Sequence, residues 1–494
     1  MIPKLKKNFI LVMQRKTKIV ATVGPASESE EMLLALAKAG VNVFRLNFSH
    51  GTHEDHQIRI DRIRKINAEH GYQCAILQDL QGPKIRIGLM ESGNDGVEIF
   101  AGNILRFASD DIIGNADRVS TPYKGMYNDV QVGERILMDD GKLEVKVIGK
   151  DGTDVITEVV YGGLLKQKKG VNLPNTNISQ PSVTDKDWED LKFGLANDVD
   201  WVALSFVRTA EEIQAIQKYI KEQGKFAKVI AKVEKPEAII NMEAIVNASD
   251  AIMVARGDLG VELPSEDVPM IQKRLVEMSN LAAKPVIVAT QMLESMIDSP
   301  RPTRAEVGDV ANAVLDGADA VMLSAESASG KYPILAVETM VNTIVKVEEL
   351  ADEKKLYFRH HTRVTEDSYT SHEKENDNVV MTACRLARDL KVKAIIGITN
   401  SGYTAFRLSH HRPKASLFVF TGNKQLATQL SLYSGVQVFI MDEVKGKNVE
   451  EVVDTIKDFL VAKGELEAGE LFINTLSLPL QRNNRTNTIK LSRV

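Results

Sequence analysis

The sequence has little cysteine, few aromatic residues and no long apolar run. Its 494 residues contain two cysteines, Cys74 and Cys384, without CxxC spacing. This excludes a disulfide framework and is typical of a reduced, cytoplasmic compartment. No stretch reaches the roughly 18 apolar residues that a membrane span needs. Basic and acidic residues nearly balance, at 62 and 67, so the charge indicates neither nucleic-acid nor membrane binding.

Several nucleotide-binding and export signals are also missing. The chain has no GxxxxGK(S/T) loop, no GxGxxG after a predicted strand and no HRD or DFG set, which excludes P-loop, dinucleotide-binding and protein-kinase folds. Residues 1–13 begin with basic residues, but the apolar run Phe9–Met13 is shorter than the roughly 7–15 residues of a signal peptide. We interpret residues 1–13 as an N-terminal extension, with Met13 as an alternative start.

The dominant pattern is a strand followed by a helix, repeated. Short, almost entirely apolar β-branched runs alternate with amphipathic stretches such as 209–223 and 304–315. Such runs are typical of parallel strands buried on both faces. The predicted strands are 17–23, 41–46, 74–79, 200–206, 228–233, 251–255, 285–290 and 319–324. Eight strands in a βα series predict a closed (β/α)₈ TIM barrel of the α/β class, and an open doubly wound sheet is the alternative.

Two further regions accompany the barrel. After the third strand, residues 83–170 change to short alternating strands with turn signals at Asp140-Gly141 and Asp151-Gly152. They predict a small inserted β-barrel domain whose two adjacent crossings form a hinge, so that it acts as a lid. The barrel is expected to use residues 14–82 and 171–351. Residues 352–494 predict a polar linker, to 377, and a C-terminal α/β regulatory domain.

Polar side chains cluster where six of the eight predicted barrel strands end. In chain order they are Arg45, Asn47, Ser49, His50, Asp79, Lys232, Glu234, Arg256, Gly257, Asp258, Thr290 and Ser324. Barrel enzymes place their sites at this face, because the βα loops converge there on one mouth. The cluster therefore predicts an active site.

The chemistry of these residues indicates an anionic substrate. Glu234 and Asp258 form an all-oxygen pair of the kind that Mg²⁺ or Mn²⁺ takes together with waters and substrate oxygens. Arg45 and Arg256 offer guanidinium groups to a phosphate or carboxylate. Lys232 beside them suits a reaction in which negative charge grows or moves. The alternative is that Lys232 and Glu234 form a simple ion pair at the barrel rim.

The histidines His50, His53 and His56 lie three residues apart, among acidic neighbours. This spacing predicts a solvated helix face and argues against a metal site.

Long motifs in the chain resemble one known family. They are TKIVATVGPAS (17–27), FRLNFSHG (44–51), LQGPKIR (80–86), KKGVNLP (168–174), VARGDLGVE (254–262), ATQMLESM (289–296) and VMLSAES (321–327). In this order they resemble pyruvate kinase across about residues 14–350, and the αβ tail resembles that family's C-terminal domain.

The resemblance implies transfer of a phosphoryl group from phosphoenolpyruvate to ADP, giving pyruvate and ATP in glycolysis, with Mg²⁺ or Mn²⁺ as cofactor. By motif, Arg45 would hold the substrate phosphate. Lys232 would stabilise charge on the moving phosphoryl group and the enolate oxygen. Glu234 and Asp258 would bind the metal.

The same matching implies the remaining roles. Gly257 and Thr290 would position the substrate carboxylate, and Ser324 with Thr290 would relay the proton to the enolate. The nucleotide phosphates would meet Asn47, His50, Arg86 and Lys169, of which the last two lie at the lid crossings. Phosphoryl transfer needs this kind of positioning and cationic stabilisation more than covalent chemistry.

One position departs from the family. Members that need K⁺ carry Thr and Glu where this chain has Leu80 and Lys84, while Asn47, Ser49 and Asp79 of the cation site remain. Lys84 would hold a tethered ammonium near Asp79, where K⁺ would otherwise bind. We expect an enzyme that does not require K⁺. The alternative is a solvated lysine with a surviving K⁺ site.

The tail carries the sequence TNSGYT (399–404) between a predicted strand and a predicted helix. Hydroxyls at a helix N-terminus can bind phosphate, and the family binds phosphorylated effectors here. The candidate residues are Thr399, Ser401, Gly402 and Thr404. An ordinary N-cap turn is the alternative. The later loop 481–487 lacks the glycines common in the family, although Arg482 and Arg485 could contact a phosphate.

The resemblance also implies a homotetramer whose ligands are phosphoenolpyruvate, ADP or ATP, pyruvate and a phosphorylated effector. No nucleic-acid or membrane partner is expected. Two other functions stay open: a different phosphoenolpyruvate-using barrel enzyme, and a catalytically silent metabolite sensor. The first does not explain Arg86 and Lys169 on an inserted lid, and the second has no need of metal ligands together with Lys232.

Overall fold

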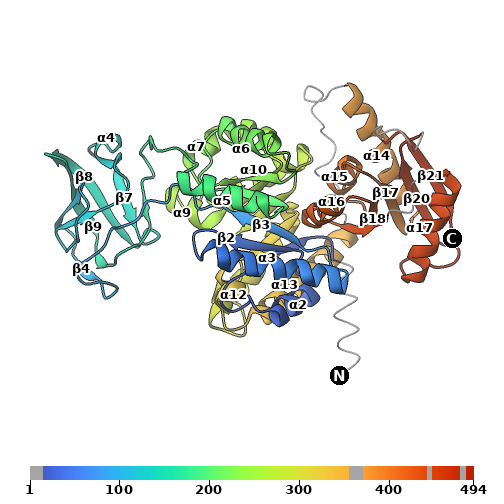
Figure 1. Ribbon diagram of the computed structural model, residues 1–494, viewed down its shortest axis with the longest axis horizontal. Helices are drawn as coiled ribbons and strands as arrows, with labels where there is room; N and C mark the ends of the chain where they lie inside the picture. Colours follow the sequence, from blue (N-terminus) through green and yellow to red (C-terminus); the bar gives the residue numbers. More distant parts are fainter. Residues whose placement is uncertain (1–14, 355–370, 442–447, 479–485) are drawn as a thin grey trace.

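The computed structural model describes residues 15–354, 371–441, 448–478 and 486–494. The N-terminal extension 1–13 and the two arginines of the late loop, Arg482 and Arg485, lie outside the described residues. The lid, the barrel and the C-terminal domain follow one another along the long axis of the molecule (Figure 1). Within the described ranges, no helix is both long and apolar enough to cross a membrane.

Eight parallel strands close into a barrel, which confirms the predicted fold and excludes the open sheet. Their side chains are almost all buried, as expected of strands covered by helices outside and packed side chains inside. Because all neighbours are parallel, the eight carboxyl ends meet at one mouth. The strands are β1 (Lys18–Thr22), β2 (Val43–Asn47), β3 (Ala75–Asp79), β12 (Trp201–Leu204), β13 (Lys228–Val233), β14 (Ala251–Ala255), β15 (Val286–Ala289) and β16 (Ala320–Leu323).

Helices surround the barrel, and several begin with reciprocal side-chain caps. In three of them a threonine hydroxyl accepts from the backbone of the first turn while an acidic side chain accepts from the threonine N–H: Thr52 with Asp55, Thr184 with Asp187 and Thr303 with Glu306. The helical elements are α2 (Glu30–Ala39), α3 (His53–His70), α5 (Asp185–Ala196), α6 (Ala210–Glu222), α7 (Pro236–Ile240), α8 (Met242–Ala248), α9 (Arg256–Glu262), α10 (Val268–Leu281), η1 (Glu294–Ile297), α11 (Arg304–Asp316), α12 (Ala325–Ala328) and α13 (Pro333–Lys354).

The chain leaves the barrel after β3 and builds the lid around its own apolar core. The lid is a half-barrel with one six-stranded sheet, one two-stranded sheet and a single helical turn. Its elements are β4 (Val97–Ile99), β5 (Ile104–Ala108), β6 (Arg118–Ser120), α4 (Met126–Asp129), β7 (Arg135–Met138), β8 (Leu143–Asp151), β9 (Asp154–Tyr161), β10 (Gly163–Leu165) and β11 (Val171–Asn172). Gly141 and Gly152 adopt positive φ in the two predicted hairpin turns. Because β11 pairs with β7, the lid sheet reaches Asn172, beyond the return predicted at residue 170.

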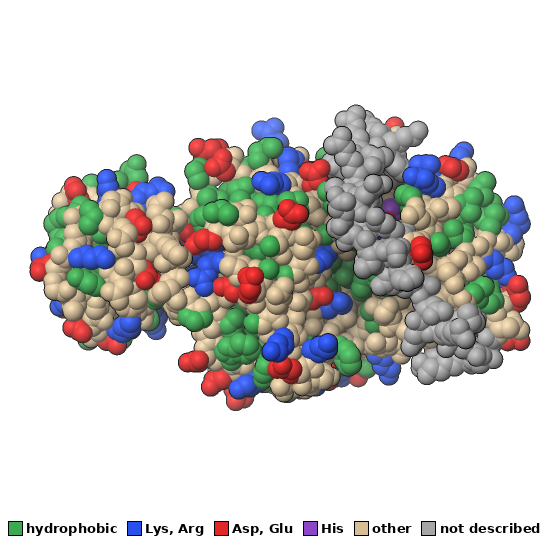
Figure 2. All heavy atoms as spheres, turned by 90° about the horizontal axis from the view of Figure 1, so that it is seen from above, with side chains coloured by type: hydrophobic (Ala, Val, Ile, Leu, Met, Phe, Trp, Pro, Cys, Tyr) green, Lys and Arg blue, Asp and Glu red, His purple; other side chains and the backbone are tan. Residues whose placement is uncertain are grey.

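The lid is joined to the barrel through a narrow waist (Figure 2). The side-chain amide of Asn172 donates to Glu262 Oε1 at 2.8 Å, and Lys235 Nζ lies 2.8 Å from the same oxygen. Lys235 and Glu262 are both buried. The returning lid strand is thus hydrogen-bonded to a barrel carboxylate that a buried lysine holds in place.

The C-terminal domain has a five-stranded sheet in the order β19-β18-β17-β20-β21, of which only β21 is antiparallel to its neighbour. Its helix α14 begins at Ser371, before the start predicted at 378. The first turns are polar, so the apolar periodicity that predicts a helix begins only later. The elements are α14 (Ser371–Asp389), β17 (Ala394–Ile398), α15 (Tyr403–His410), β18 (Ser416–Thr421), α16 (Lys424–Gln429), η4 (Leu430–Leu432), β19 (Val436–Ile440), α17 (Val449–Ala462), β20 (Leu471–Leu476) and β21 (Thr488–Arg493).

This domain closes the amino-terminal end of the barrel, opposite the mouth. The Tyr433 ring lies 6.3 Å from the ring of Trp201, and both belong to one core that continues from the barrel interior. Polar contacts surround the apolar centre: Lys18 Nζ donates to Val436 O at 2.7 Å, and Arg412 pairs with Asp319 at 2.9 Å.

Asp200 lies in the same interface and is fully buried. It accepts hydrogen bonds from the backbone N–H of Ile76, at 2.7 Å, and from the Thr428 hydroxyl. Burial raises the pKa of Asp200 to about 7, although the hydrogen bonds from Thr428 and Ile76 lower it. The folded protein therefore holds this proton up to about pH 7, whereas the unfolded chain releases it near pH 4.

Between about pH 4 and pH 7 the folded state binds more protons at this site than the unfolded state, so stability falls as the pH rises through this window. We predict that Asp200→Asn removes this component. The measurement is the urea midpoint at several pH values, followed by tryptophan fluorescence, because both tryptophans, Trp188 and Trp201, are in the barrel. Asp389→Asn, at an exposed site, is the control. An equal slope in wild type and Asp200→Asn would contradict the prediction.

Candidate active site

Four charged side chains from three barrel strands form a buried cluster at the mouth. Arg45 in β2 donates through Nε to Asp79 Oδ2 at 2.6 Å, and Asp79 ends β3. Lys232 in β13 lies 3.1 Å from Asp79 Oδ1 and 3.0 Å from Glu234 Oε1. The side chains of Asp79 and Glu234 are each 1% exposed. The structure therefore brings these four residues together at the mouth, as their positions at strand ends predict.

Asp79 and Lys232 keep their charges in spite of burial. Burial favours the uncharged form of Asp79, but Lys232 and Arg45 outweigh it and hold the pKa of Asp79 below its usual value. Burial also opposes the charge of Lys232, yet Asp79 and Glu234 raise its pKa. Lys232 is therefore a permanent cation, suited to stabilising negative charge and unsuited to releasing a proton.

Two hydroxyls that the sequence analysis missed complete this cluster. Thr22 ends β1 and accepts from Arg45 Nη1 at 2.9 Å. Ser205 directly follows β12 and accepts from Lys232 Nζ at 2.7 Å, while its own hydroxyl donates to Leu80 O. Both lie at the carboxyl ends of the two strands for which no site residue was predicted. Their position at strand ends was the signal in the sequence that could have identified Thr22 and Ser205 as site residues.

The two predicted metal ligands lie on one side of the cluster. Glu234 follows β13, and Asp258 lies in the first turn of α9. Burial raises the pKa of Glu234, Lys232 lowers it, and the negative charge of Asp258 raises it again, so the two carboxylates are close enough to repel each other. In the described parts of the chain, no group of three or more metal-binding side chains occurs. Two carboxylates suit Mg²⁺ or Mn²⁺, which take their other ligands from water and substrate oxygens.

A strained turn after β15 places Thr290 beside Gly257. Thr290 has φ +68°, an unfavourable value for a β-branched residue. Three hydrogen bonds hold it: Thr290 Oγ1 accepts from Gly257 N at 2.7 Å and donates to Ala289 O, and Arg256 Nη2 donates to Thr290 O at 2.6 Å. Arg256 also pairs with Asp309 at 2.6 Å and is buried. Arg256 also lines the cleft beside this turn, so the expectation that it binds a substrate anion stays a prediction, although its guanidinium now bonds to the turn and to Asp309.

A cleft of about 520 Å³ opens beside this turn. It is lined by Gly257, Asp258, Thr290 and Ser324 from the barrel and by Asp140 from the lid. The Ser324 hydroxyl is buried and has no hydrogen-bond partner among the described residues. A cleft shared by lid and barrel is where a lid can enclose a substrate.

The lid crossings bring further cations to the mouth. Burial and the charges of Arg86, Arg45 and Lys84 all lower the pKa of His50, so three cations lie near this side chain. Lys169 Nζ lies 2.8 Å from Asp139 within the lid. Such a concentration of positive charge favours phosphate groups.

Lys84 does not lie against Asp79. Its Nζ is 3.7 Å from Asp258 Oδ1, and both side chains are about one-third exposed. The predicted contact is absent because Arg45 and Lys232 already occupy both carboxylate oxygens of Asp79.

The loop after β2 holds the remaining predicted residues of the mouth. Ser49 N donates to Asn47 Oδ1 at 3.1 Å. His50 is exposed, but His56 is buried and stacks on Phe48, with ring centroids 3.9 Å apart. The predicted solvation therefore fails for His56, which packs on the loop, whereas His50 is exposed and the His53 side chain is 40% exposed.

The predicted effector residues lie in the C-terminal domain, away from the mouth. Gly402 N donates to Thr399 Oγ1 at 2.9 Å, and the hydroxyls of Thr404 and Thr486 are hydrogen-bonded. Thr399 and Thr404 are buried, whereas Ser401 is exposed. Gly402 is the N-cap of α15, without a side-chain cap, and Ser401 is exposed, so the effector site and the ordinary turn both stay predictions.

Comparisons with known proteins agree with this architecture. Residues 14–337 match the family model "Pyruvate kinase, barrel domain", and residues 377–492 match "Pyruvate kinase, alpha/beta domain". The chain is 41% identical to a pyruvate kinase of Geobacillus stearothermophilus over 482 residues, covering 97% of this chain and 80% of that protein. It is 44% identical to one of Staphylococcus aureus strain MRSA252 over 480 residues, with the same coverage. The crystal structure of a pyruvate kinase from Cryptosporidium parvum superposes with a TM-score of 0.91 at 35% identity, covering 98% and 97% of the two chains.

We predict that Asp79→Asn lowers the free energy of unfolding of the barrel by about 3–5 kcal/mol, because two buried cations lose their shared carboxylate. Urea unfolding followed by tryptophan fluorescence measures the change. The control is Asp111→Asn, which breaks an exposed pair with Lys124 and should change the midpoint little. Equal midpoints for Asp79→Asn and wild type would show that the cluster does not need this charge.

Proposed function

Because this chain belongs to the pyruvate kinase family, its reaction is phosphoryl transfer from phosphoenolpyruvate to ADP, and we propose that the buried cluster of Arg45, Asp79, Lys232 and Glu234 is the centre of that reaction. The bond from phosphorus to the enol oxygen breaks, and a bond to the terminal oxygen of ADP forms. The electron pair stays on the enolate, which gains a proton at carbon and becomes pyruvate. The cluster carries the proposal because it holds fixed cations where this charge develops.

Glu234 and Asp258 are the ligands that we assign to the divalent cofactor of the family, Mg²⁺ or Mn²⁺. The mutual repulsion of the two carboxylates, which a divalent cation would relieve, supports this assignment. When bound, the ion draws negative charge from phosphoryl and enol oxygens. Lys232 lies 3.0 Å from Glu234 and orients that ligand.

Arg45 and Lys232 bind the phosphoryl group in this proposal. Both are held by Asp79, so they need little reorganisation when charge moves from the phosphoryl group to the enolate. The substrate carboxylate binds at Gly257 and Thr290. Gly257 N–H now donates to Thr290 Oγ1, and an incoming carboxylate would take over that donor.

The proton for the enolate comes from the Ser324 side of the cleft. Lys232 cannot supply it, since its pKa is raised by Asp79 and Glu234. The buried Ser324 hydroxyl without a partner among the described residues, with Thr290 lining the same cleft, supports a hydroxyl relay.

The nucleotide phosphates bind between the loop after β2 and the lid. Asn47 and His50 provide the barrel side, and Arg86 and Lys169 provide the lid side. The positive charge around His50 supports this role. Lys169 must exchange its partner Asp139 for a phosphate, which lid closure would allow.

We also propose that the enzyme works without K⁺. Lys84 provides a tethered cation at the mouth, 3.7 Å from Asp258, which supports the replacement of a monovalent ion although the contact with Asp79 is absent.

The C-terminal domain is proposed to bind a phosphorylated effector at Ser401 and its neighbours, and the chain to form a homotetramer. The exposed position of Ser401 at the turn before α15 supports the first point, and family membership supports the second. A sedimentation mass other than that of four chains would contradict the tetramer.

The test is pyruvate formation from phosphoenolpyruvate and ADP with Mg²⁺, in buffer free of K⁺ and NH₄⁺ and then with K⁺ added. We expect full activity in both buffers. Lys232→Met should lower kcat by about 10²–10³-fold, because a fixed cation no longer faces the developing charge. Lys84→Glu should lose activity without K⁺ and recover when K⁺ is added.

The results in the two buffers test the reaction and the role of Lys84 separately. Activity of wild type only with K⁺ would keep the reaction and contradict the role of Lys84. Absence of pyruvate in both buffers, from folded protein, would contradict the assignment of the reaction to this chain.

A further inference from the structure

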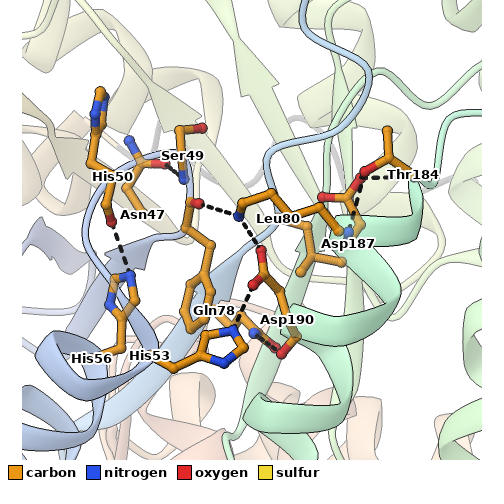
Figure 3. A network of polar contacts seen from close by, with 12 residues as sticks. Asn47, Ser49, His50, His53, His56, Gln78, Leu80, Thr184, Asp187 and Asp190 are labelled. Atoms are coloured by element: carbon orange, nitrogen blue, oxygen red, sulfur yellow. Dashed lines mark hydrogen bonds and ion pairs between the residues drawn. The ribbon is translucent and has the colours of Figure 1, made fainter.

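The loop that carries Asn47, Ser49 and His50 is held by two side chains from outside it. Lys186 Nζ donates to the carbonyl oxygen of Phe48 at 2.9 Å. His56 Nε2 donates to the carbonyl oxygen of His50 at 3.0 Å, while the His50 side chain points away from these contacts (Figure 3). The carbonyl groups of the two residues that flank Ser49, Phe48 and His50, are therefore fixed.

The first support depends on helix α5 and its residue Asp190, which also holds His53, a residue of α3 whose ring lies 6.3 Å from that of Phe48. Asp190 Oδ2 pairs with Lys186 Nζ at 2.5 Å, and Asp190 Oδ1 is bonded to His53 Nε2 at 2.7 Å (Figure 3). Asp190 is only 4% exposed, whereas Lys186 and His53 are 52% and 40% exposed. A nearly buried carboxylate thus organises two half-exposed partners, and neither partner is needed to fill the core.

Aromatic packing fixes the same loop against α3 and α5. The His56 ring stacks on Phe48, and the His53 ring stacks on Phe193 of α5, with centroids 4.4 Å apart. Burial and the neighbouring Arg59 lower the pKa of His56 to about 4, so the imidazole is neutral at physiological pH. A neutral ring with its proton on Nε2 is the form that donates to the His50 carbonyl.

Helix α5 is itself fixed to the barrel and to the lid crossing. The Gln78 side-chain amide in β3 donates to Asp190 O at 2.6 Å, and a Cβ at Gly194 would overlap this amide, so α5 packs closely on β3. Asp187, one turn before Asp190, accepts from Gly82 N at 3.0 Å, where the chain leaves for the lid. Two neighbouring side chains of α5 therefore make these contacts: Asp187 holds Gly82, where the chain leaves for the lid, and Lys186 holds the loop after β2.

We propose that Asp190 is a positioning residue for the nucleoside diphosphate: with Lys186 and His53 it holds the loop after β2 in the conformation that meets the nucleotide phosphates. This inference rests on the proposed function of the mouth. A loop that is ordered before binding loses less conformational entropy when the ligand arrives, so loosening it weakens nucleotide binding. Arg45 is held by Asp79 and Thr22 and is independent of this network, so binding of phosphoenolpyruvate is unaffected.

The test compares Asp190→Asn, Lys186→Met and His53→Gln with wild type in steady-state kinetics with both substrates. We expect each variant to raise the KM for ADP, by about tenfold for Asp190→Asn, which corresponds to one charge-assisted hydrogen bond. The KM for phosphoenolpyruvate should stay within about twofold. Because all three residues act through one network, Asp190→Asn combined with His53→Gln should raise the KM for ADP by less than the product of the single effects.

Asp185→Asn is the matched control, since it removes an exposed carboxylate from the same helix and should leave both KM values unchanged. Unchanged KM for ADP in Asp190→Asn and Lys186→Met would overturn the inference while the reaction itself stands. An equal rise of both KM values with a lower thermal midpoint would also overturn it, because that is the signature of a purely structural role. Failure of wild type to form pyruvate would contradict the proposed function as well.

Discussion

The charge balance at Asp79 is the interaction on which the barrel mouth depends. Two cations from different strands, Arg45 and Lys232, are nearly buried there, and a buried cation is tolerated only when it is paired. Asp79 provides that partner for both, and Glu234 provides a second one for Lys232. Because the backbone of a closed barrel fixes these strands, the cations are held at set positions before any ligand arrives. An anionic substrate therefore meets donors that have already been oriented.

The same charge balance at Asp79 determines whether Lys232 can act as an acid. The carboxylates that make burial of Lys232 possible also raise its pKa, so it stabilises charge and cannot act as an acid. The buried Ser324 hydroxyl, which has no hydrogen-bond partner among the described residues, lies in the cleft beside Thr290. The strained turn at Thr290 is maintained by Arg256. The guanidinium of Arg256 donates to a backbone carbonyl of this turn and pairs with Asp309.

Much of the fold could be predicted because its signals are local. Apolar runs identified all eight barrel strands, and the strand-end rule identified Arg45, Asp79, Lys232 and Glu234 as neighbours. The partners of side chains were less predictable, since they depend on packing between distant segments. Lys84 contacts Asp258, because Arg45 and Lys232 already bind both carboxylate oxygens of Asp79. His53 bonds to Asp190, which lies on a helix that follows the whole lid in the sequence. Neither fact is visible in spacing along the chain.

The two ends of the barrel are connected by strands that are very short. Lys18, Asp200 and Asp319 contact the C-terminal domain at the closed end, at or just before the starts of β1, β12 and β16. The residues at the other ends of those strands are Thr22, Ser205 and Ser324, which line the mouth. Each of the three strands has only four or five residues. The contacts with the C-terminal domain and these residues of the mouth are therefore separated by no more than the length of one short strand.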